Sequence, residues 1–181
     1  MSDPIPVIRS RRETTRNRFF TGIEEDLVTA AGDYTYCSVA CQYDAVVVIP
    51  VLDDGRLVVE RIYRHPYRAF MHEFPAGGIE KGENPLTAAA RELEEETGYR
   101  ARQFTLLQAF AALPGLMTMH LSLVLATGLT HDGTTHLETL ELLEVLTLSE
   151  TEAWTLADRQ PASAFLTLGL LALQRQRRAD R

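Results

Sequence analysis

The segment from Glu73 to Tyr99 constrains the fold more than any other part of this 181-residue chain. Its second half predicts a helix, because Asn84 can cap the first turn, Pro85 suits the first helical position and Gly98 can end the helix in a left-handed turn. We therefore expect a helix that packs one side on a core. The residues that make up its apolar face, at helical spacing, are Leu86, Ala89, Ala90 and Leu93.

Three glutamates of the same helix form an acidic cluster beside the apolar face. Glu92, Glu95 and Glu96 stand at positions i, i+3 and i+4, so their carboxylates are neighbours. They lie in the last turns, where the helix dipole favours cations, and like charges at these spacings repel. A divalent cation such as Mg²⁺ would relieve the conflict, because it pairs carboxylates with substrate phosphates. The alternative for these three residues alone is a solvated acidic face.

A glycine-rich loop precedes the helix and favours a binding site over a solvated face. Gly77, Gly78 and Gly82 leave room for the backbone to come close to a bound group. The whole pattern runs Gly77, five residues, Glu83, seven residues, Arg91-Glu92-Leu93, one residue, Glu95-Glu96, one residue, Gly98-Tyr99. This pattern resembles the Nudix box, and a match of this length is far more specific than a short glycine motif. Tyr99 stands where the family usually has an aliphatic residue.

The bulk properties are those of a compact globular enzyme. The hydrophobic content is 45% and the charged content 24%, both ordinary for a folded domain. The net charge of −7 argues against nucleic acid as the main partner. Cys37 and Cys41 are too few for a disulfide scaffold, and no Cys/His cluster completes a zinc site. We expect a cytoplasmic protein without a membrane partner, because neither a signal-peptide run nor a membrane-length apolar stretch is present.

The N-terminal part of the chain predicts a β arm. Residues 1–15 are polar and rich in arginine, and we expect them to be flexible. The short strands that follow must pair with the main sheet or with another subunit, because they have few partners of their own. We therefore divide the chain into a dimer-forming arm, residues 1–43, and a catalytic domain, residues 44–181. The strands expected in the arm are 18–20, 26–29 and 34–37.

The second part of the chain alternates strands and helices, which predicts an α/β fold with a sheet covered on both faces. The apolar run 45–51 and the segment 57–61 are expected to form a hairpin around Asp53-Asp54-Gly55. A capping box of Ser149 and Glu152 begins a short helix that ends near Ala157. The other expected elements are strands at 104–110, 120–126 and 142–148, an exposed loop at 127–138, and a helix at 161–175 that buries Phe165, Leu168, Leu171 and Ala172.

The Nudix resemblance implies an α/β/α sandwich with a mixed β-sheet, and it extends beyond the box to one subgroup. Residues 61–64 and 73–77 are similar to the approach to the box in ADP-ribose pyrophosphatases, with Ile62 in place of the usual glutamine. Pro114, fifteen residues after Tyr99, stands close to the downstream proline of that subgroup. Its members are dimers that exchange an N-terminal arm, so the resemblance also implies a homodimer.

The resemblance implies Mg²⁺-dependent hydrolysis of a nucleoside diphosphate linked to another group, with ADP-ribose as the leading substrate and Mn²⁺ as an alternative ion. By analogy, Glu92 and Glu96 are the main metal ligands, Glu95 assists them, and the Ala76 carbonyl completes the shell. Arg91 orients the glutamates through charge-assisted hydrogen bonds.

Other residues are expected to hold the substrate or to activate water. Arg64 and Glu73 are candidates for holding the terminal ribose or the diphosphate, and Glu83 supports the glycine loop or a metal-bound water. Gly77 and Gly78 belong to the same substrate-binding segment. The general base is expected on a loop well after the box, where Glu141 is the first choice and Glu138 the second.

Three alternatives to this function are considered, one within enzymes and two from other classes. The enzyme could act on another nucleotide sugar or on a dinucleotide. A nucleotide-sensing module could keep the fold without turnover, although the intact glutamate cluster argues against it. A nucleic-acid or RNA-cap processing enzyme would show a basic groove with interleaved aromatic residues, and the arginines here are scattered.

Overall fold

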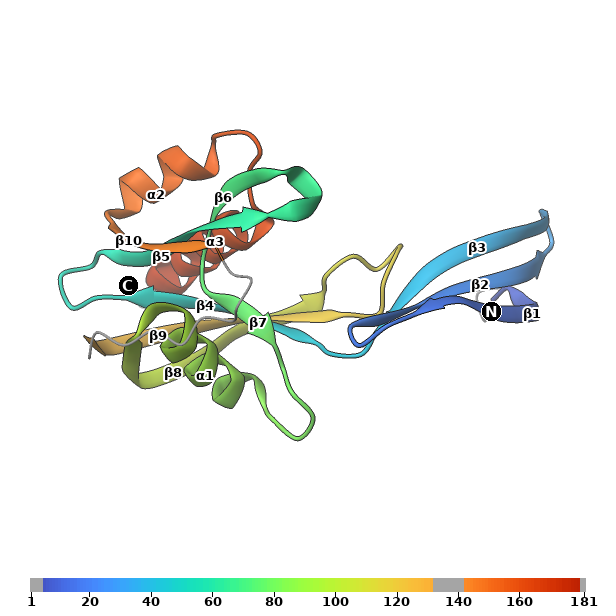
Figure 1. Cartoon of the computed structure of the whole chain (residues 1–181), viewed down its shortest axis with the longest axis horizontal. Coiled ribbons are helices and arrows are strands. Elements are labelled where there is room, and N and C mark those ends of the chain that lie inside the picture. Colours follow the sequence, from blue (N-terminus) through green and yellow to red (C-terminus); the bar gives the residue numbers. More distant parts are fainter. Residues whose placement is uncertain (1–4, 132–141, 180–181) are drawn as a thin grey trace. The chain divides into compact units, whose positions relative to one another are not determined.

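The computed structural model describes residues 5–131 and 142–179, and the chain forms two compact units (Figure 1). The first unit comprises residues 1–44 and 111–120, and the second comprises residues 45–110 and 121–181. Within the described residues no helix is both long enough and apolar enough to cross a membrane.

The first unit is built on an antiparallel three-stranded sheet in the order β1-β2-β3. The segment 111–120 joins it through Val39, whose backbone N–H donates to the carbonyl of Leu116 at 2.8 Å, and through Tyr36, whose hydroxyl donates to the carbonyl of Gly115 at 2.5 Å. The sequence-based boundaries did not include this segment in the arm. The strands are β1 (Val7–Arg16), β2 (Phe20–Thr29) and β3 (Gly32–Cys41).

The first strand corrects the prediction of flexibility for residues 7–15, whereas residues 1–4 lie outside the described residues. β1 is polar, but its arginines meet acidic partners on β2 and β3, and opposite charges across a sheet stabilise pairing. Arg9 forms an ion pair with Asp33 at 2.6 Å, and Arg12 forms one with Glu24. The alternation of apolar and polar residues that usually identifies a strand in a sequence is missing from β1, because its pairing depends on charge.

The other predicted strands of the arm are confirmed only in part. The segments 26–29 and 34–37 lie inside β2 and β3, which are longer than expected. The prediction of a strand at 18–20 is wrong for residues 18 and 19, which form a bend. The side-chain oxygen of Asn17 accepts hydrogen bonds from the backbone N–H groups of Phe19 and Phe20, at 2.8 and 3.0 Å, and this local turn competes with strand structure.

The second unit is an α/β/α sandwich, as predicted. Its mixed sheet has the order β10-β5-β4-β9-β8, with β6 paired to β5 and β7 paired to β4. β4 and β9 run parallel, whereas β4 and β5, like β5 and β10, run antiparallel. The strands are β4 (Ala45–Val51), β5 (Leu57–Arg64), β6 (Ala69–Glu73), β7 (Ala76–Gly78), β8 (Tyr99–Ala111), β9 (His120–His131) and β10 (Leu143–Leu148), with a short 3₁₀ helix η1 (His65–Tyr67) between β5 and β6.

Three helices cover the sheet: α1 (Pro85–Thr97), α2 (Glu150–Ala157) and α3 (Ala164–Ala179). Val46 and Val48 of β4 lie in one core cluster with Ala88, Ala89 and Leu93 of α1. Ile49 points to the opposite face of the same strand, where it lies beside Gly169 of α3. α1 and α3 therefore lie on opposite faces of the sheet (Figure 1).

The caps of α1 confirm the sequence-based helix. The side chain of Asn84 accepts hydrogen bonds from the backbone N–H groups of Leu86 and Thr87, at 2.9 and 3.1 Å. Gly98 ends the helix with φ of 70°, a conformation that glycine adopts without steric cost. Leu86, predicted to be part of the apolar face, is 39% exposed. The capping box of Ser149 and Glu152 at the start of α2 is also present.

Several boundaries differ from the prediction, and three of them change which residues belong to an element or to the core. β9 continues to His131, so residues 127–131 are strand and not loop, while residues 132–138 lie outside the described residues. β8 begins at Tyr99, five residues before the expected start. α3 begins at Ala164 and buries Leu166, Gly169, Leu170 and Leu173, whereas Leu171, predicted to be buried, is 50% exposed. In a helix this rich in leucine several faces are apolar, so periodicity alone does not select the buried one.

Gly169 decides which face of α3 is buried. A Cβ atom at this position would lie 2.4 Å from Cδ2 and 2.6 Å from Cε2 of Phe74, which is fully buried. The helix can therefore come this close to the sheet only where it has no side chain.

We predict that Gly169→Ala destabilises the second unit. Overpacking costs about 1–3 kcal/mol, whereas the better helix propensity of alanine returns at most about 1 kcal/mol. Thermal unfolding should show a melting temperature lower by a few degrees. Leu171→Ala, which truncates an exposed side chain of the same helix, is the control and should have the smaller effect. An unchanged or higher melting temperature for Gly169→Ala would show that α3 does not pack this closely.

Candidate active site

The two glutamates at i and i+4 in the last turns of α1 are buried. Glu92 is 9% exposed and Glu96 is 5% exposed, because the face next to the apolar one lies against β7. One carboxylate oxygen of Glu96, Oε2, accepts a hydrogen bond of 2.9 Å from the backbone N–H of Ala76. A buried carboxylate needs such compensation. The strand before the helix thus fixes one of the predicted metal ligands.

Gly77 makes room for the second buried glutamate. A Cβ atom at position 77 would lie 1.9 Å from Oε1 and 2.1 Å from Cδ of Glu92. Any side chain there would push the carboxylate away. The sequence predicted that the backbone here comes close to a bound group, whereas the group that lies against Gly77 in the structure is the carboxylate of Glu92.

Arg91 connects the remaining acidic residues of the box. Its Nε and Nη2 atoms donate to the two carboxylate oxygens of Glu83, at 3.1 and 3.0 Å. Its Nη1 atom donates to Glu92 at 2.8 Å and to Glu95 at 3.2 Å, and Nη2 also donates to the carbonyl of Gly78 at 2.8 Å. The hydrogen bond with Glu83 and the neighbouring charges raise the pKa of Arg91. In turn, the hydrogen bond from Arg91 lowers the pKa of Glu83.

Arg64 and Glu73 form a second charged group on β5 and β6. The Nη2 atom of Arg64 donates to Oε2 of Glu73 at 2.7 Å, and Nε lies 3.2 Å from both carboxylate oxygens. Glu73 is 4% exposed, whereas the Arg64 side chain is 36% exposed. Burial lowers the pKa of Arg64, but the hydrogen bond and the charge of Glu73, followed by the charges of Glu96 and Glu60, raise it above its ordinary value.

The carboxylates have the donor chemistry that a divalent cation requires. Glu92, Glu95 and Glu96 offer hard oxygen atoms on adjacent positions of one helix, and two of the three side chains are buried. Within residues 5–131 and 142–179 no three acidic, histidine or cysteine side chains are already grouped to hold a metal ion. Arg91 instead bonds to Glu92 and Glu95. The oxygen ligands of these residues suit a divalent cation, and a bound cation would have to compete with Arg91 for the carboxylates of Glu92 and Glu95.

The structure thus brings together most of the predicted site residues. The box residues lie on β7, on α1 and in the loop between them. Arg64 and Glu73 belong to the same region, because the charge of Glu96 raises the pKa of Arg64. Glu138 and Glu141, the predicted candidates for the general base, lie outside the described residues. Sequence reasoning missed Glu60, which is 1% exposed on β5. The available signal was an acidic residue that directly follows the apolar run Leu57-Val58-Val59 within one strand.

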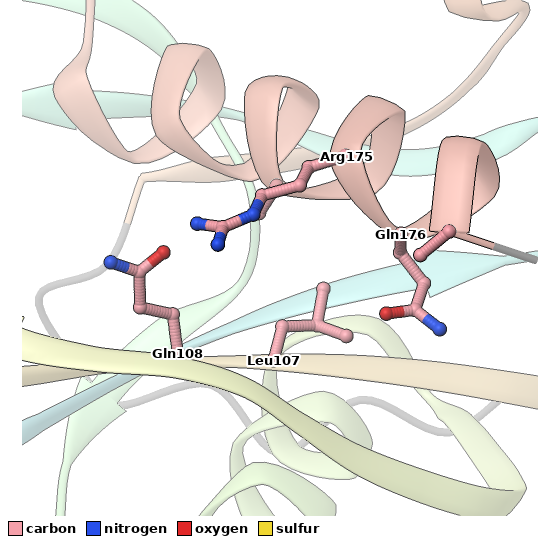
Figure 2. A pocket seen from close by; sticks show the side chains of 6 residues that line it. Leu107, Gln108, Arg175 and Gln176 are labelled. Atoms are coloured by element: carbon pink, nitrogen blue, oxygen red, sulfur yellow. The ribbon is translucent and has the colours of Figure 1, made fainter.

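A cavity of about 400 Å³ lies elsewhere in the second unit, between β8 and α3 (Figure 2). Figure 2 shows the guanidinium of Arg175 pointing toward the side of the cavity where Gln108 lies. None of the predicted site residues lines this cavity, so it does not belong to the candidate active site. Its lining residues are Leu107, Gln108, Ala172, Arg175, Gln176 and Ala179.

Comparison with known proteins decides the family. Residues 42–165 match the NUDIX domain, which is more than half of the chain. The chain belongs to the Nudix family. The Nudix pyrophosphatases are generally dependent on a divalent metal.

Several characterised relatives are similar to this Nudix protein. A methanol dehydrogenase activator from Bacillus methanolicus is 38% identical over 60% of both chains. An ADP-ribose pyrophosphatase from Bacillus subtilis is 46% identical over 39% of this chain and 38% of its own length. An ADP-sugar pyrophosphatase from Mus musculus is 36% identical over 69% of this chain and 62% of its own. This chain therefore spans less than two thirds of the length of each of these relatives.

A solved structure confirms the fold over the whole chain. The crystal structure of an ADP compounds hydrolase superposes with a TM-score of 0.88 and covers 99% of this chain and 98% of that one. The sequence identity is 24%, so this likeness concerns the fold.

We predict that Gly77→Ala weakens divalent metal binding. The added methyl group displaces the carboxylate of Glu92, a proposed metal ligand, and the loss of a residue that supports a metal ligand typically costs about 10- to 100-fold in metal affinity. Titration calorimetry with Mn²⁺ measures the change. Gly115→Ala is the matched control, because a Cβ atom there meets no heavy atom within 4 Å. Equal Mn²⁺ affinities for a folded Gly77→Ala variant and the wild type would contradict a role for Glu92.

Proposed function

We propose that this protein is a Mg²⁺-dependent pyrophosphatase that hydrolyses a nucleoside diphosphate linked to another group, with ADP-ribose as the leading substrate. The observation that carries the proposal is the pair of buried glutamates, Glu92 and Glu96, held against β7 in a complete Nudix box. The B. subtilis and mouse relatives, named for ADP-ribose and ADP-sugars, support the substrate class.

The proposed reaction requires a water nucleophile and neutralisation of the negative charge on the pyrophosphate. Water adds to one phosphorus of the pyrophosphate, the bond from that phosphorus to the bridging oxygen breaks, and the bridging oxygen leaves with the other phosphate. ADP-ribose would give AMP and ribose 5-phosphate. A bound divalent cation supplies charge neutralisation and polarises the water. Glu92 and Glu96 would hold it, with Glu95 and the Ala76 carbonyl as further ligands.

The two arginines have different proposed roles. Arg91 keeps the glutamates of the box in place, since it donates to Glu83, Glu92 and Glu95. Arg64 is partly exposed and anchored by the buried Glu73, so this pair can hold the diphosphate or the terminal ribose through the planar guanidinium of Arg64. Gly77, Gly78 and Glu83 shape the loop beside the diphosphate.

The general base is proposed from the sequence. Glu141 is the first choice and Glu138 the second, and both lie outside the described residues. A base within reach of water typically contributes about 10²- to 10⁴-fold to the rate. Glu141→Gln should therefore lower kcat more than Glu138→Gln does.

The decisive experiment is product analysis with nucleotide sugars, dinucleotides and nucleoside triphosphates, in Mg²⁺ and in EDTA. We expect metal-dependent release of AMP from ADP-ribose, and we expect Glu96→Gln to lower it by about 100-fold or more, because a metal ligand is lost. Glu94→Gln is the matched control, since Glu94 lies in the same helix and pairs with Arg100.

The other outcomes separate the alternatives. Preference for another nucleotide sugar or a dinucleotide would keep the mechanism and replace the substrate. Nucleotide binding without turnover on the whole panel would identify a sensing module and refute the enzymatic proposal.

We also propose that residues 1–43 form an arm through which two copies associate, next to a Nudix domain of residues 44–181. Every residue of β1 is exposed within the first unit. Val7 is 65% exposed and Ile8 56% exposed, and Tyr34 on β3 is 49% exposed. A sheet with this much exposed apolar area indicates a protein partner, and the family resemblance favours a second copy.

We predict a dimer in solution whose formation depends on β1. Light scattering should give twice the monomer mass of 20.3 kDa for the wild type. The double variant Val7→Asp with Ile8→Asp should shift the mass to that of a monomer, because charged groups are costly to bury in an interface. Tyr67→Asp, at a residue of the second unit that is 66% exposed, is the control and should remain dimeric. A monomeric wild type would refute the proposal.

A further inference from the structure

Glu60 is an acidic side chain buried in the middle of β5. It is 1% exposed, and its neighbours on the same face of the strand, Val58 and Ile62, are 0% and 3% exposed. Arg64 follows on that face, four residues along the strand. None of the roles given above to the box or to the substrate-binding residues uses Glu60.

The strand register places Glu60 next to Glu73. The two residues are direct partners in the antiparallel pairing of β5 and β6, so their side chains leave the sheet on the same face. Both are buried, at 1% and 4% exposed. Two buried carboxylates this close together need a cation to compensate them.

Arg64 provides this cation. Its guanidinium reaches back along the sheet to Glu73, which accepts from Nε and Nη2. The charge of Glu60 acts on the same guanidinium, together with that of Glu96. Within the described residues Nη1 of Arg64 makes no hydrogen bond, and the side chain is 36% exposed. One edge of the guanidinium is therefore anchored, and the other can receive a ligand.

We propose that Glu60 is a positioning residue, which together with Glu73 fixes the guanidinium of Arg64 in the orientation that binds the substrate. This rests on the proposed function, in which Arg64 holds the diphosphate or the terminal ribose. Arginine has many rotamers, so a guanidinium held by one carboxylate alone must lose more freedom when a ligand binds. The second buried carboxylate reduces this loss and raises substrate affinity without touching the substrate.

A purely structural role for Glu60 predicts different results. Loss of a core residue lowers stability and the amount of active enzyme, but it does not change KM. A positioning role changes KM, leaves kcat nearly constant and requires Arg64. Repulsion between Glu60 and the anionic substrate would change KM in the opposite direction.

The first experiment measures kcat, KM and melting temperature for Glu60→Gln, which keeps the shape and removes the charge. We expect KM to rise about 3- to 20-fold, less than the loss of a whole charge-assisted hydrogen bond, with kcat changed by less than about twofold. The control is Glu144→Gln on β10, a carboxylate that is 61% exposed and pairs with Arg61 on the opposite face of β5. Its KM should equal that of the wild type.

A double-mutant cycle tests whether Glu60 acts through Arg64. Arg64→Met alone should raise KM, and Glu60→Gln should add nothing in that background, because the group that it positions is gone. Glu60→Asp serves if the Gln variant does not fold, and it should give an intermediate rise in KM. A full effect of Glu60→Gln without Arg64, an unchanged KM or a lower KM would overturn the proposal.

A measurement without substrate separates this proposal from the proposed function. The ¹⁵N–¹H signal of Arg64 Nε, assigned by its absence in Arg64→Met, reports how firmly the guanidinium is held. Exchange of this proton with water should be faster in Glu60→Gln and unchanged in Glu144→Gln. If the wild type turned over no nucleotide but this difference in exchange appeared, the result would support the positioning role of Glu60 and refute the proposed pyrophosphatase activity. Equal exchange in wild type and Glu60→Gln would overturn the positioning even in an active enzyme.

Discussion

The close approach of β7 to α1 is the constraint on which the rest of the candidate site depends. Gly77 has no side chain, so the carboxylate of Glu92 can lie where a Cβ atom would be. Beside it, the N–H of Ala76 donates to Glu96. This contact is possible because Ala88 and Ala89 let α1 pack tightly on Val46 and Val48. Small residues on β7 and on α1 thus determine how deeply Glu92 and Glu96 are buried.

Burial of these acids makes charge compensation the second requirement. Glu60, Glu73, Glu92 and Glu96 are all at most 9% exposed. Arg91 and Arg64 are the arginines that meet them, and each acts on more than one carboxylate. Because a buried carboxylate without compensation is costly, loss of either arginine affects several acidic groups at once.

The sequence predicted local features whose physical cause is itself local. The caps at Asn84 and Gly98 and the capping box at Ser149 depend on residues within a few positions of each other. Features that depend on distant partners were missed. β1 forms because its arginines meet acids on other strands, and the buried face of α3 follows from the contact of Gly169 with Phe74. A role for Glu60 could not be predicted from the sequence, because it depends on the pairing that places Glu73 of β6 opposite it.

The balance of charge also explains why metal and substrate would have to bind in order. Among the described residues the candidate site holds more buried carboxylates than arginines, so an anionic diphosphate approaching it would meet net repulsion. A divalent cation on the glutamates of α1 would offset this negative charge. The cation would also compete with Arg91 for the carboxylate of Glu92. Arg64 pairs with Glu73, which is not a proposed metal ligand, so this ion pair would remain when the metal binds. The arginine proposed to meet the substrate is thus not the one with which a bound metal would compete.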